Sequence, residues 1–349
     1  MTKVDLLNLL PDELCEFVRS ELSEPKYKAT QIFEWLHKGA QIDEMTTLSL
    51  KTRKLLDEKA FVNLPTVVKK LQSQKDGTIK YLFSLHDTQR IESVFMRYKH
   101  GNTICISSRA GCRMGCKFCA STIGGLSRNL EPSEMLGQII SVQKDTGERI
   151  SNVVMMGIGE PLDNFDNTVK FLKLVNEKGG LNIGYRHISV STSGLVDRIY
   201  DLAKCDFPIT LSISLHASDN EERSNIMPVN KKWPIERLLT ACREYFEVTG
   251  RRISFEYTLI KGKNDSVGDA YKLSEILKKY LGNKIPIHVN LIPLNEVKET
   301  GLQTSTRQSV NLFKETLEKN GITATLRRTL GPDINASCGQ LRQNSETVQ

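Results

Sequence analysis

The chain has 349 residues, of which 39% are apolar and 26% charged, as expected for a soluble globular protein with a sizeable core. Its length fits one barrel-sized domain with a small appendage. No run of about 18 apolar residues occurs, which excludes a membrane-spanning helix. The N-terminal sequence lacks the small-residue cleavage pattern of a signal peptide. We therefore expect a cytoplasmic protein, in which eight cysteines indicate metal binding or catalysis rather than structural disulfides.

The net charge of +7 is distributed unevenly along the chain. Residues 1–60 have a net charge of −2, and residues 131–349 have a net charge of +1. Residues 61–130 hold 11 basic and 3 acidic side chains, a net charge of +8. Such a segment attracts polyanions, nucleic acid first among them, although a solvated basic face that binds nothing has the same composition.

The first part of the chain changes from a helical to a strand-like pattern. Apolar residues three or four apart predict helices over 5–22, 28–39 and 49–60. Residues 65–108 alternate apolar and polar side chains in short runs separated by turn residues, which predicts strands. We expect residues 1–95 to form a helical accessory domain with a β linker, suspected of RNA binding, and residues 96–349 to form the second domain.

The second domain alternates strands and helices, which predicts a parallel α/β sheet. Several strands are nearly continuous apolar runs, as expected when both faces are buried. Six such units would curl into an open barrel or wind on both sides of a flat sheet. The expected strands are 103–108, 151–157, 187–192, 209–215, 252–260 and 286–293, and the expected helices are near 132–146, 164–178, 195–204, 234–248, 266–281 and 306–320.

Polar residues and glycines gather where these strands end. In parallel α/β folds the carboxyl ends of the strands carry the chemistry, so these groups predict one shared site. Each group also has an ordinary explanation: the glycines serve turns, Ser191 caps a helix, and His216 is a satisfied buried histidine. The groups are a cysteine loop, Gly157-Ile158-Gly159-Glu160-Pro161, Ser191-Thr192-Ser193-Gly194, Ser214-Leu215-His216 and Asn290.

The cysteine loop reads GCRMGCKFCAS and contains Cys112, Cys116 and Cys119. A structural zinc site needs four ligands, and Cys105 would have to be the fourth, although it alternates within the preceding strand. A cubane iron–sulfur cluster is also held by cysteine thiolates, and three of them leave one iron free to bind a small molecule. Cluster, zinc and unliganded thiols are the three alternatives.

The C-x3-C-x-aromatic-C spacing resembles that of the radical S-adenosylmethionine (SAM) enzymes. Further blocks resemble, in order, the RlmN/Cfr family, which methylates an aromatic carbon of adenosine in RNA. They are CISSRAGCRMGCKFCAS, VVMMGIGEPLDN, ISVSTSGL, LSISLHASDNEERSNIMPVN, EYTLIKGKNDS, HVNLIPLN and DINASCGQL.

This resemblance implies a partial (β/α)6 TIM-like barrel, a [4Fe-4S] cluster on the three cysteines, and SAM. The resemblance, together with the physical character of the strand ends, places the SAM contacts at Gly159, Glu160, Ser191, Ser214, Leu215, His216 and Asn290.

The resemblance also implies a mechanism with two catalytic cysteines. Cys338 would receive a methyl group from one SAM, and a radical derived from a second SAM would activate that S-methyl group and add it to adenine. Cys105 would then attack the sulfur of Cys338, forming a disulfide and releasing the base, and Glu92 would take the ring proton. Without the resemblance, Cys105 is a buried small hydrophobe, Cys338 a tail thiol and Glu92 a surface carboxylate near Arg90 and Arg97.

The implied substrates are 23S rRNA and the tRNA adenosine next to the anticodon. Gly159-Glu160-Pro161 resembles the branch that methylates C2 of adenine, and C8 methylation, which confers antibiotic resistance, is the alternative. A monomer with no membrane attachment is expected, served by an electron donor such as flavodoxin or ferredoxin. A zinc-containing RNA-binding protein and a radical enzyme for small molecules are the rival interpretations. Candidate phosphate contacts are Lys69, Lys70, Lys75, Lys80, Arg90, Arg97 and Lys99, with Arg327, Arg328 and Arg342.

Overall fold

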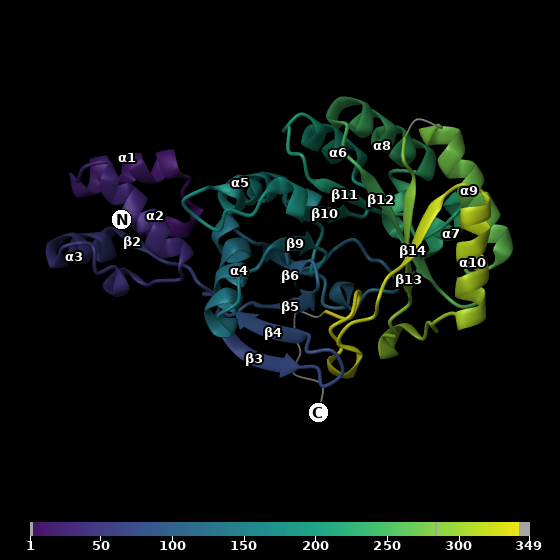
Figure 1. Ribbon diagram of the computed structural model, residues 1–349, viewed down its shortest axis with the longest axis horizontal. Helices are drawn as coiled ribbons and strands as arrows, with labels where there is room; N and C mark the ends of the chain where they lie inside the picture. Colours follow the sequence, from purple (N-terminus) through teal and green to yellow (C-terminus); the bar gives the residue numbers. More distant parts are fainter. Residues whose placement is uncertain (1–2, 283–284, 342–349) are drawn as a thin grey trace.

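The computed structural model describes residues 3–282 and 285–341, so Arg342 lies outside the described residues. Its centre is a ten-stranded sheet in the order β14-β13-β12-β11-β10-β9-β6-β5-β4-β3 (Figure 1). The strands from β6 through β9 to β14 pair in parallel order, whereas β3, β4, β5 and β6 pair with one another in antiparallel order. The strands are β3 (Thr66–Gln72), β4 (Ile79–Ser84), β5 (Arg90–Tyr98), β6 (Gly101–Cys105), β9 (Asn152–Met155), β10 (Ile188–Thr192), β11 (Thr210–Ser214), β12 (Ile253–Leu259), β13 (His288–Pro293) and β14 (Thr323–Leu326).

The predicted parallel strands are all present. Every residue of β12 is buried, as expected for a strand covered on both faces. The sheet also contains β14, a seventh parallel strand that pairs with β13 and was not expected. Its four residues are mostly exposed and carry no continuous apolar run, so the sequence gives no strand signal there.

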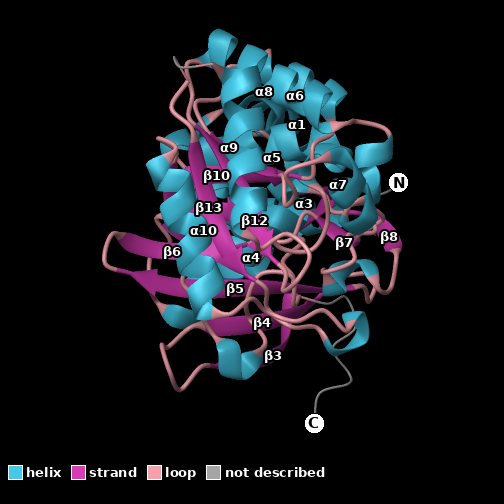
Figure 2. Ribbon diagram, turned by 90° about the vertical axis from the view of Figure 1, so that its right-hand side faces the viewer, coloured by secondary structure: helices cyan, strands magenta, loops and turns pink. Residues whose placement is uncertain are grey.

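The helices cover the outer face of the parallel strands (Figure 2). Two of them, α4 and α8, end at glycines in the left-handed conformation, Gly147 and Gly250, which stop a helix at low cost. The six predicted helices are confirmed, and the short polar helix α7 was not expected. The helices of this part are α4 (Pro132–Thr146), α5 (Phe165–Asn176), α6 (Val196–Ala203), α7 (Asn220–Ile226), α8 (Ile235–Thr249), α9 (Val267–Leu281) and α10 (Arg307–Lys319).

The N-terminal helices form a separate bundle beside α4 and α5 (Figure 1). They are α1 (Pro11–Leu22), α2 (Tyr27–His37) and α3 (Leu50–Lys59), closed by the parallel pair β1 (Val4–Asp5) and β2 (Ala60–Phe61). Side-chain bonds join the bundle to the sheet domain, for example Asn8 to Glu131 at 2.6 Å. Residue 95, near which a domain boundary was expected, lies within β5, and β5 is hydrogen-bonded to β6.

Side chains from several strands line shared cavities on the inner face of the sheet, which shows that the sheet is curved around that face. The strands are β6, β9, β10, β11, β12 and β13. The C-terminal segment (residues 327–341) follows β14 and packs on β5 and β6 through Ala336 and Leu341. Asp333 accepts hydrogen bonds from the Ser73 hydroxyl (2.6 Å) and from the Gln74 N–H (3.0 Å), which fixes this segment to the turn after β3. No helix in the described part of the chain is long and apolar enough to cross a membrane.

Candidate active site

The carboxyl ends of the parallel strands surround a cavity of about 930 Å³ that is partly open to solvent, here called the carboxyl-end cavity. A concave site at the carboxyl ends of parallel strands, lined by convergent polar groups, is the usual place for a small molecule or cofactor. Among the residues expected from the sequence, those that line it are Cys112, Cys116, Cys119, Gly159, Glu160, Ser191, Ser214, His216 and Cys338.

The three-cysteine loop (residues 112–125) forms one wall of this cavity. It leaves β7 (Arg109–Gly111) and returns through β8 (Leu126–Asn129), which pair in antiparallel order. The Lys117 N–H donates to the Ile226 carbonyl (2.9 Å), and the Ala120 N–H donates to the Gly339 carbonyl (2.7 Å). The loop is therefore held both by α7 and by the segment that carries Cys338.

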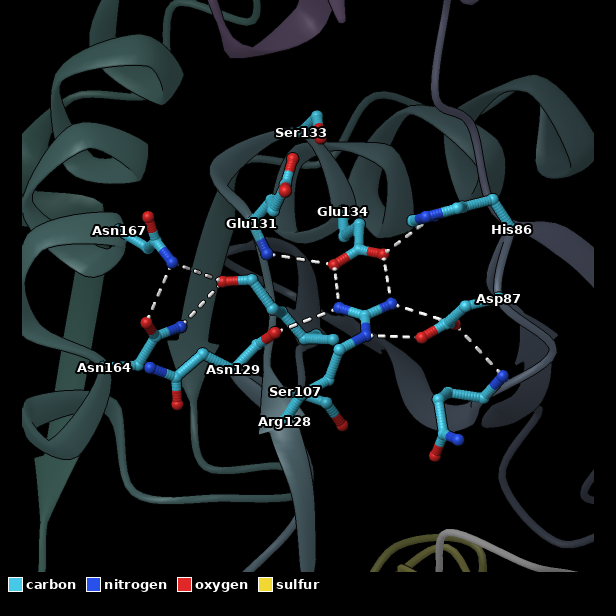
Figure 3. Close-up of polar contacts among 12 residues, drawn as sticks. His86, Asp87, Ser107, Arg128, Asn129, Glu131, Ser133, Glu134, Asn164 and Asn167 are labelled. Carbon is cyan, nitrogen blue, oxygen red and sulfur yellow. Dashed lines mark hydrogen bonds and ion pairs between the residues drawn. The ribbon is translucent and has the colours of Figure 1, made fainter. Parts of the chain in front are cut away.

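A charged network braces the base of this loop (Figure 3). Arg128 of β8 binds both carboxylate oxygens of Glu134 at 2.7 Å and both oxygens of Asp87 at 2.6 and 2.9 Å. Asn164 donates to the carbonyl of Leu130 at 2.7 Å. Bidentate arginine–carboxylate pairs fix geometry as well as charge, so the loop starts from a rigid base that joins β8, α4 and the β4–β5 turn.

The three cysteines provide soft donors in a buried setting. Burial raises the pKa of Cys112 to about 11 and also raises the pKa of Cys116 and Cys119, and the neighbouring thiols contribute to the shifts of Cys112 and Cys116. Three thiolates so placed require a compensating cation, which suits an iron–sulfur cluster. Within residues 3–282 and 285–341, no three Cys, His, Asp or Glu side chains are arranged to hold a single metal ion. Cys105 lies outside this cavity, so it does not join the three as a fourth ligand.

The turn after β9 approaches the loop so closely that it requires glycine. A Cβ on Gly157 would lie 2.6 Å from the backbone oxygen of Ile106, and one on Gly159 would lie 2.5 Å from Cβ of Arg109. Gly159 also has φ of +101°, which side chains disfavour. These glycines therefore do more than form a turn, because they allow two strand ends to meet at the cavity.

Glu160 joins the ends of β9 and β10 beneath the cavity. Its carboxylate accepts hydrogen bonds from the Ser193 N–H (2.6 Å) and from the Leu162 N–H (3.1 Å). Burial raises its pKa, and these N–H donors lower it. A buried carboxylate that lines a cavity is suited to the ammonium or hydroxyl groups of a ligand.

His216 is a buried histidine with backbone partners. Its Nδ1 accepts the Thr258 N–H (2.9 Å), so the neutral ring carries its proton on Nε2. Burial lowers its pKa to about 3, with Arg223 as the second cause. Its ring meets Phe118 of the three-cysteine loop edge to face, with centroids 4.9 Å apart. His216 is therefore a buried, hydrogen-bonded histidine, which is one of the two interpretations of the sequence. It also lines the cavity, as the other interpretation requires.

Cys105 and Cys338 share a second cavity beside the first, here called the side cavity. Cys338 lines both cavities, and so does Arg327. Burial raises the pKa of Cys105 to about 12, with Cys338 as a second cause, whereas Arg327 lowers it. All eight cysteines are free thiols in the structure, so no disulfide joins Cys105 to Cys338.

Three other predicted residues lie away from the carboxyl-end cavity. Leu215 is fully buried in the core. Asn290 lies in the amino half of β13 and donates to the Glu256 carboxylate at 2.7 Å. Glu92 is fully buried rather than on the surface, lies 3.0 Å from the Lys80 ammonium, and lines a pocket with residues of the C-terminal segment.

Comparison with known proteins decides the family. A protein of Alkaliphilus oremlandii, named a probable dual-specificity RNA methyltransferase RlmN, is 52% identical over 344 residues, which are 98% of each chain. A protein of the same name from Clostridioides difficile is 48% identical over 98% of each chain. The chain belongs to the RlmN family. It is therefore a radical SAM RNA methyltransferase.

The remaining comparisons agree with the RlmN assignment. The model of the Radical SAM superfamily matches residues 106–273, and the model of the ribosomal RNA large subunit methyltransferase N-terminal domain matches residues 4–62. The crystal structure of a radical SAM methyltransferase from Sphaerobacter thermophilus is 40% identical, covers 98% of this chain and 100% of that chain, and has a TM-score of 0.92. The partial-barrel fold and the family predicted from the sequence are thus confirmed. Membership implies a [4Fe-4S] cluster and SAM, and the three thiols provide the donors that such a cluster uses.

The RlmN-family site also contains a residue that the sequence did not single out. Arg223 of α7 is fully buried. Its guanidinium donates to the carbonyls of Leu215 (3.0 Å), Ser193 (2.7 Å) and Ser214 (3.0 Å) and to the side chain of Asn230 (2.9 Å). It thereby ties the ends of β10 and β11 together behind the cavity. The sequence NEERSNI has the polar composition of a solvent-exposed helix. The structural role of Arg223 becomes visible only in the fold, where its guanidinium contacts the three carbonyls.

Proposed function

We propose that this chain methylates C2 of an adenosine in 23S rRNA and of the adenosine next to the anticodon in tRNA, through an S-methylated Cys338 and with two SAM per turnover. The observation that carries the proposal is the position of Cys338, which lines both the three-cysteine cavity and the cavity of Cys105. The dual-specificity names of the relatives support both substrates. These substrates place the protein in the cytoplasm, with an electron donor such as flavodoxin or ferredoxin.

The cluster would be held by Cys112, Cys116 and Cys119, and SAM by the strand-end residues; when bound, they would supply the methyl group and the radical chemistry. The chain's own contribution begins with Cys338, whose sulfur receives the methyl group and holds the one-carbon unit against the adenine ring. The Ala120 N–H donates to the carbonyl of Gly339, so the residue after Cys338 is fixed to the three-cysteine loop. This contact supports a position of Cys338 beside the methyl donor.

Cys105 serves as the resolving thiol in this proposal. Its sulfur attacks the sulfur of Cys338, the bond between that sulfur and the transferred carbon breaks, and the carbon keeps the electron pair and takes a proton. A thiol with a pKa of about 12 is protonated near neutral pH and is a poor nucleophile. Burial therefore keeps Cys105 as the thiol, whose proton must leave before or during the attack on Cys338.

Glu92 is the proposed base for the ring proton. It is buried on β5, and Val94, two residues along the same strand, lines the side cavity. Lys80 contacts Glu92 at 3.0 Å and also donates to the carbonyl of Asn335 (3.2 Å) in the C-terminal segment. This shared lysine connects the carboxylate to the segment that carries Cys338. Proton transfer requires Glu92 to come within hydrogen-bond reach of the ring, directly or through one water.

Mass spectrometry of adenosines from rRNA and tRNA, with and without the gene, tests the proposal. Loss of C2-methyladenosine from both RNAs is expected, and loss of C8-methyladenosine would favour the alternative position. Cys112→Ala should remove the brown colour and the deoxyadenosine product, whereas Cys105→Ala should keep the colour and trap protein on RNA. Normal turnover by the Cys105 variant would refute its resolving role. Cys15→Ala is the matched control, because Cys15 lies on α1 of the N-terminal bundle.

A further inference from the structure

The amino half of the barrel interior is polar and open rather than packed. A closed TIM barrel fills its interior with layers of branched apolar side chains. Here a cavity with about 1030 Å³ of empty space, partly open to solvent, lies at the amino ends of the strands, and we call it the amino-end cavity. The small polar side chains that line it are Thr103, Asn152, Ser189, Thr210, Ser212 and Ser254.

This amino-end cavity adjoins the two cavities of the active site. Ser189 and Ser212 line the amino-end cavity, whereas Ser191 and Ser214, two residues further along the same strands, line the carboxyl-end cavity. Two residues of a strand span about 7 Å, which is comparable to one nucleobase. Met156 and Arg327 line all three cavities. Arg327 contacts Met156 (3.3 Å) and Glu256 (3.5 Å), so these side chains stand between the cavities, and a path from the amino-end cavity to Cys338 runs past them.

The rim of the amino-end cavity carries cations that have no acidic partner in the described part of the chain. Arg186 precedes β10, Arg252 precedes β12, and both are exposed. The only carboxylate among the lining residues is Glu256, which is buried and contacts Arg327 (3.5 Å) and Asn290 (2.7 Å). The rim therefore presents positive charge that is available to a polyanion.

Several cations of residues 61–130, the basic segment expected to bind RNA, form ion pairs within the fold. Lys70 pairs with Asp145, and Arg97 pairs with Glu148. Lys80 pairs with the buried Glu92. Part of the +8 charge of residues 61–130 is thus balanced within the fold, whereas Lys69, Lys75 and Lys99 are exposed. The exposed arginines that line the amino-end cavity itself are Arg186 and Arg252.

An aromatic pair also lies at this cavity. The rings of Tyr98 and His100 are stacked, with centroids 5.1 Å apart and planes at 18°. His100 is exposed, and Tyr98 lines both the amino-end cavity and the side cavity of Cys105. Stacking on such rings is the usual way in which proteins hold unpaired bases, and arginines hold the adjoining phosphates.

We propose that the target nucleotide of the RNA enters through the amino-end cavity, with its neighbouring phosphates on Arg186 and Arg252 and an unpaired base on the Tyr98–His100 pair. The inference rests on the proposed function, because it names the path by which an adenosine taken out of its stack reaches Cys338. The proposed path requires an unpaired or flipped nucleotide, because a base held in a duplex stack cannot enter a cavity in the protein interior.

The test measures the affinity of the anaerobic holoenzyme for a fluorescein-labelled RNA hairpin with an unpaired adenosine in its loop, as a function of salt. Each of Arg186→Ala and Arg252→Ala should weaken binding about tenfold at about 0.1 M salt and reduce the salt slope by about one. Lys70→Ala, which removes an ammonium already paired with Asp145, should retain the slope. Tyr98→Leu should weaken binding about tenfold without changing the slope, and Tyr98→Phe should restore it.

Arg243→Ala is the matched control, because Arg243 lies on the outer helix α8 with 43% of its side chain exposed. Affinities and slopes equal to those of this control in both arginine variants would overturn the proposed path. Methylation of Cys338, read from the mass of its peptide without RNA, should be unchanged in the arginine variants. A wild-type holoenzyme that binds the hairpin and fails to methylate it refutes the proposed function instead.

Discussion

His37, at the end of α2, is expected to make the free energy of unfolding depend on pH. His37 is buried between the ring of Phe33, 4.1 Å away between centroids, and the backbone of Gly180, where an added Cβ would lie 2.7 Å from its Cδ2. Its Nδ1 donates to the Phe33 carbonyl (2.9 Å), and its Nε2 has no hydrogen-bond partner within the described residues. Protonation would add a buried N–H without an acceptor, and burial lowers the pKa of His37 to about 4.

The direction of this pH dependence follows from the pKa values of His37 in the unfolded and the folded chain. The unfolded chain binds the proton near 6.5, and the folded chain binds it only near 4. The free energy of unfolding is therefore highest above the unfolded value, falls as the pH drops from 6.5 towards 4, and levels below that. The whole difference corresponds to about 3.4 kcal/mol, of which about 1.4 kcal/mol is lost between about pH 7.5 and about pH 5.5.

Urea unfolding followed by circular dichroism measures this loss. His37→Phe removes the titrating group, so its free energy of unfolding should fall by about 1.4 kcal/mol less than that of the wild type over this pH range. Other buried histidines titrate in both proteins and cancel in the comparison. His100→Gln, a change at an exposed ring, should keep the wild-type dependence. An identical pH dependence in the wild type and His37→Phe would refute the reasoning.

Three further predictions concern the active site. Arg223→Met leaves three buried carbonyls without their donor and should lower the free energy of unfolding by about 3 kcal/mol or more, at about 1 kcal/mol or more for each unsatisfied acceptor, measured by urea unfolding. Gly157→Ala, whose Cβ would meet the Ile106 backbone at 2.6 Å, should lower the iron bound per chain, whereas Gly268→Ala on α9 should not. Cys105, with a pKa of about 12, should be alkylated by iodoacetamide about a thousandfold more slowly than an unperturbed thiol near neutral pH, as read from peptide masses.

The regular part of the fold was predictable because its signals are local. Strands buried on both faces give continuous apolar runs, and amphipathic helices repeat every three to four residues. The strand β14 lacks such a run, and α7 is short and polar, so neither gave a signal.

The site was predictable only in part, because burial and partners depend on the whole fold. Glu92 and Arg223 are charged residues in polar runs, yet both are fully buried. Asn290 is in the strand expected from the sequence, and a displacement of a few residues along that strand moves it from one end of the barrel to the other. The loop residues that line one cavity are, by contrast, those whose position is fixed by the end of a strand.

The three antiparallel strands β3 to β5 continue the hydrogen-bonded sheet of the barrel strands, with one irregularity in the pairing between Val67 and Lys69. Movement of these three strands relative to the barrel would have to break the hydrogen bonds between β5 and β6. We therefore expect β3 to β5 to move with the barrel as one rigid unit. The C-terminal segment is attached differently, by isolated bonds such as Ser121 to the Leu341 carbonyl (2.8 Å). Exchanging this C-terminal segment between relatives should therefore transfer Cys338, the thiol proposed to carry the methyl group, while β3 to β5 keep their positions in the sheet.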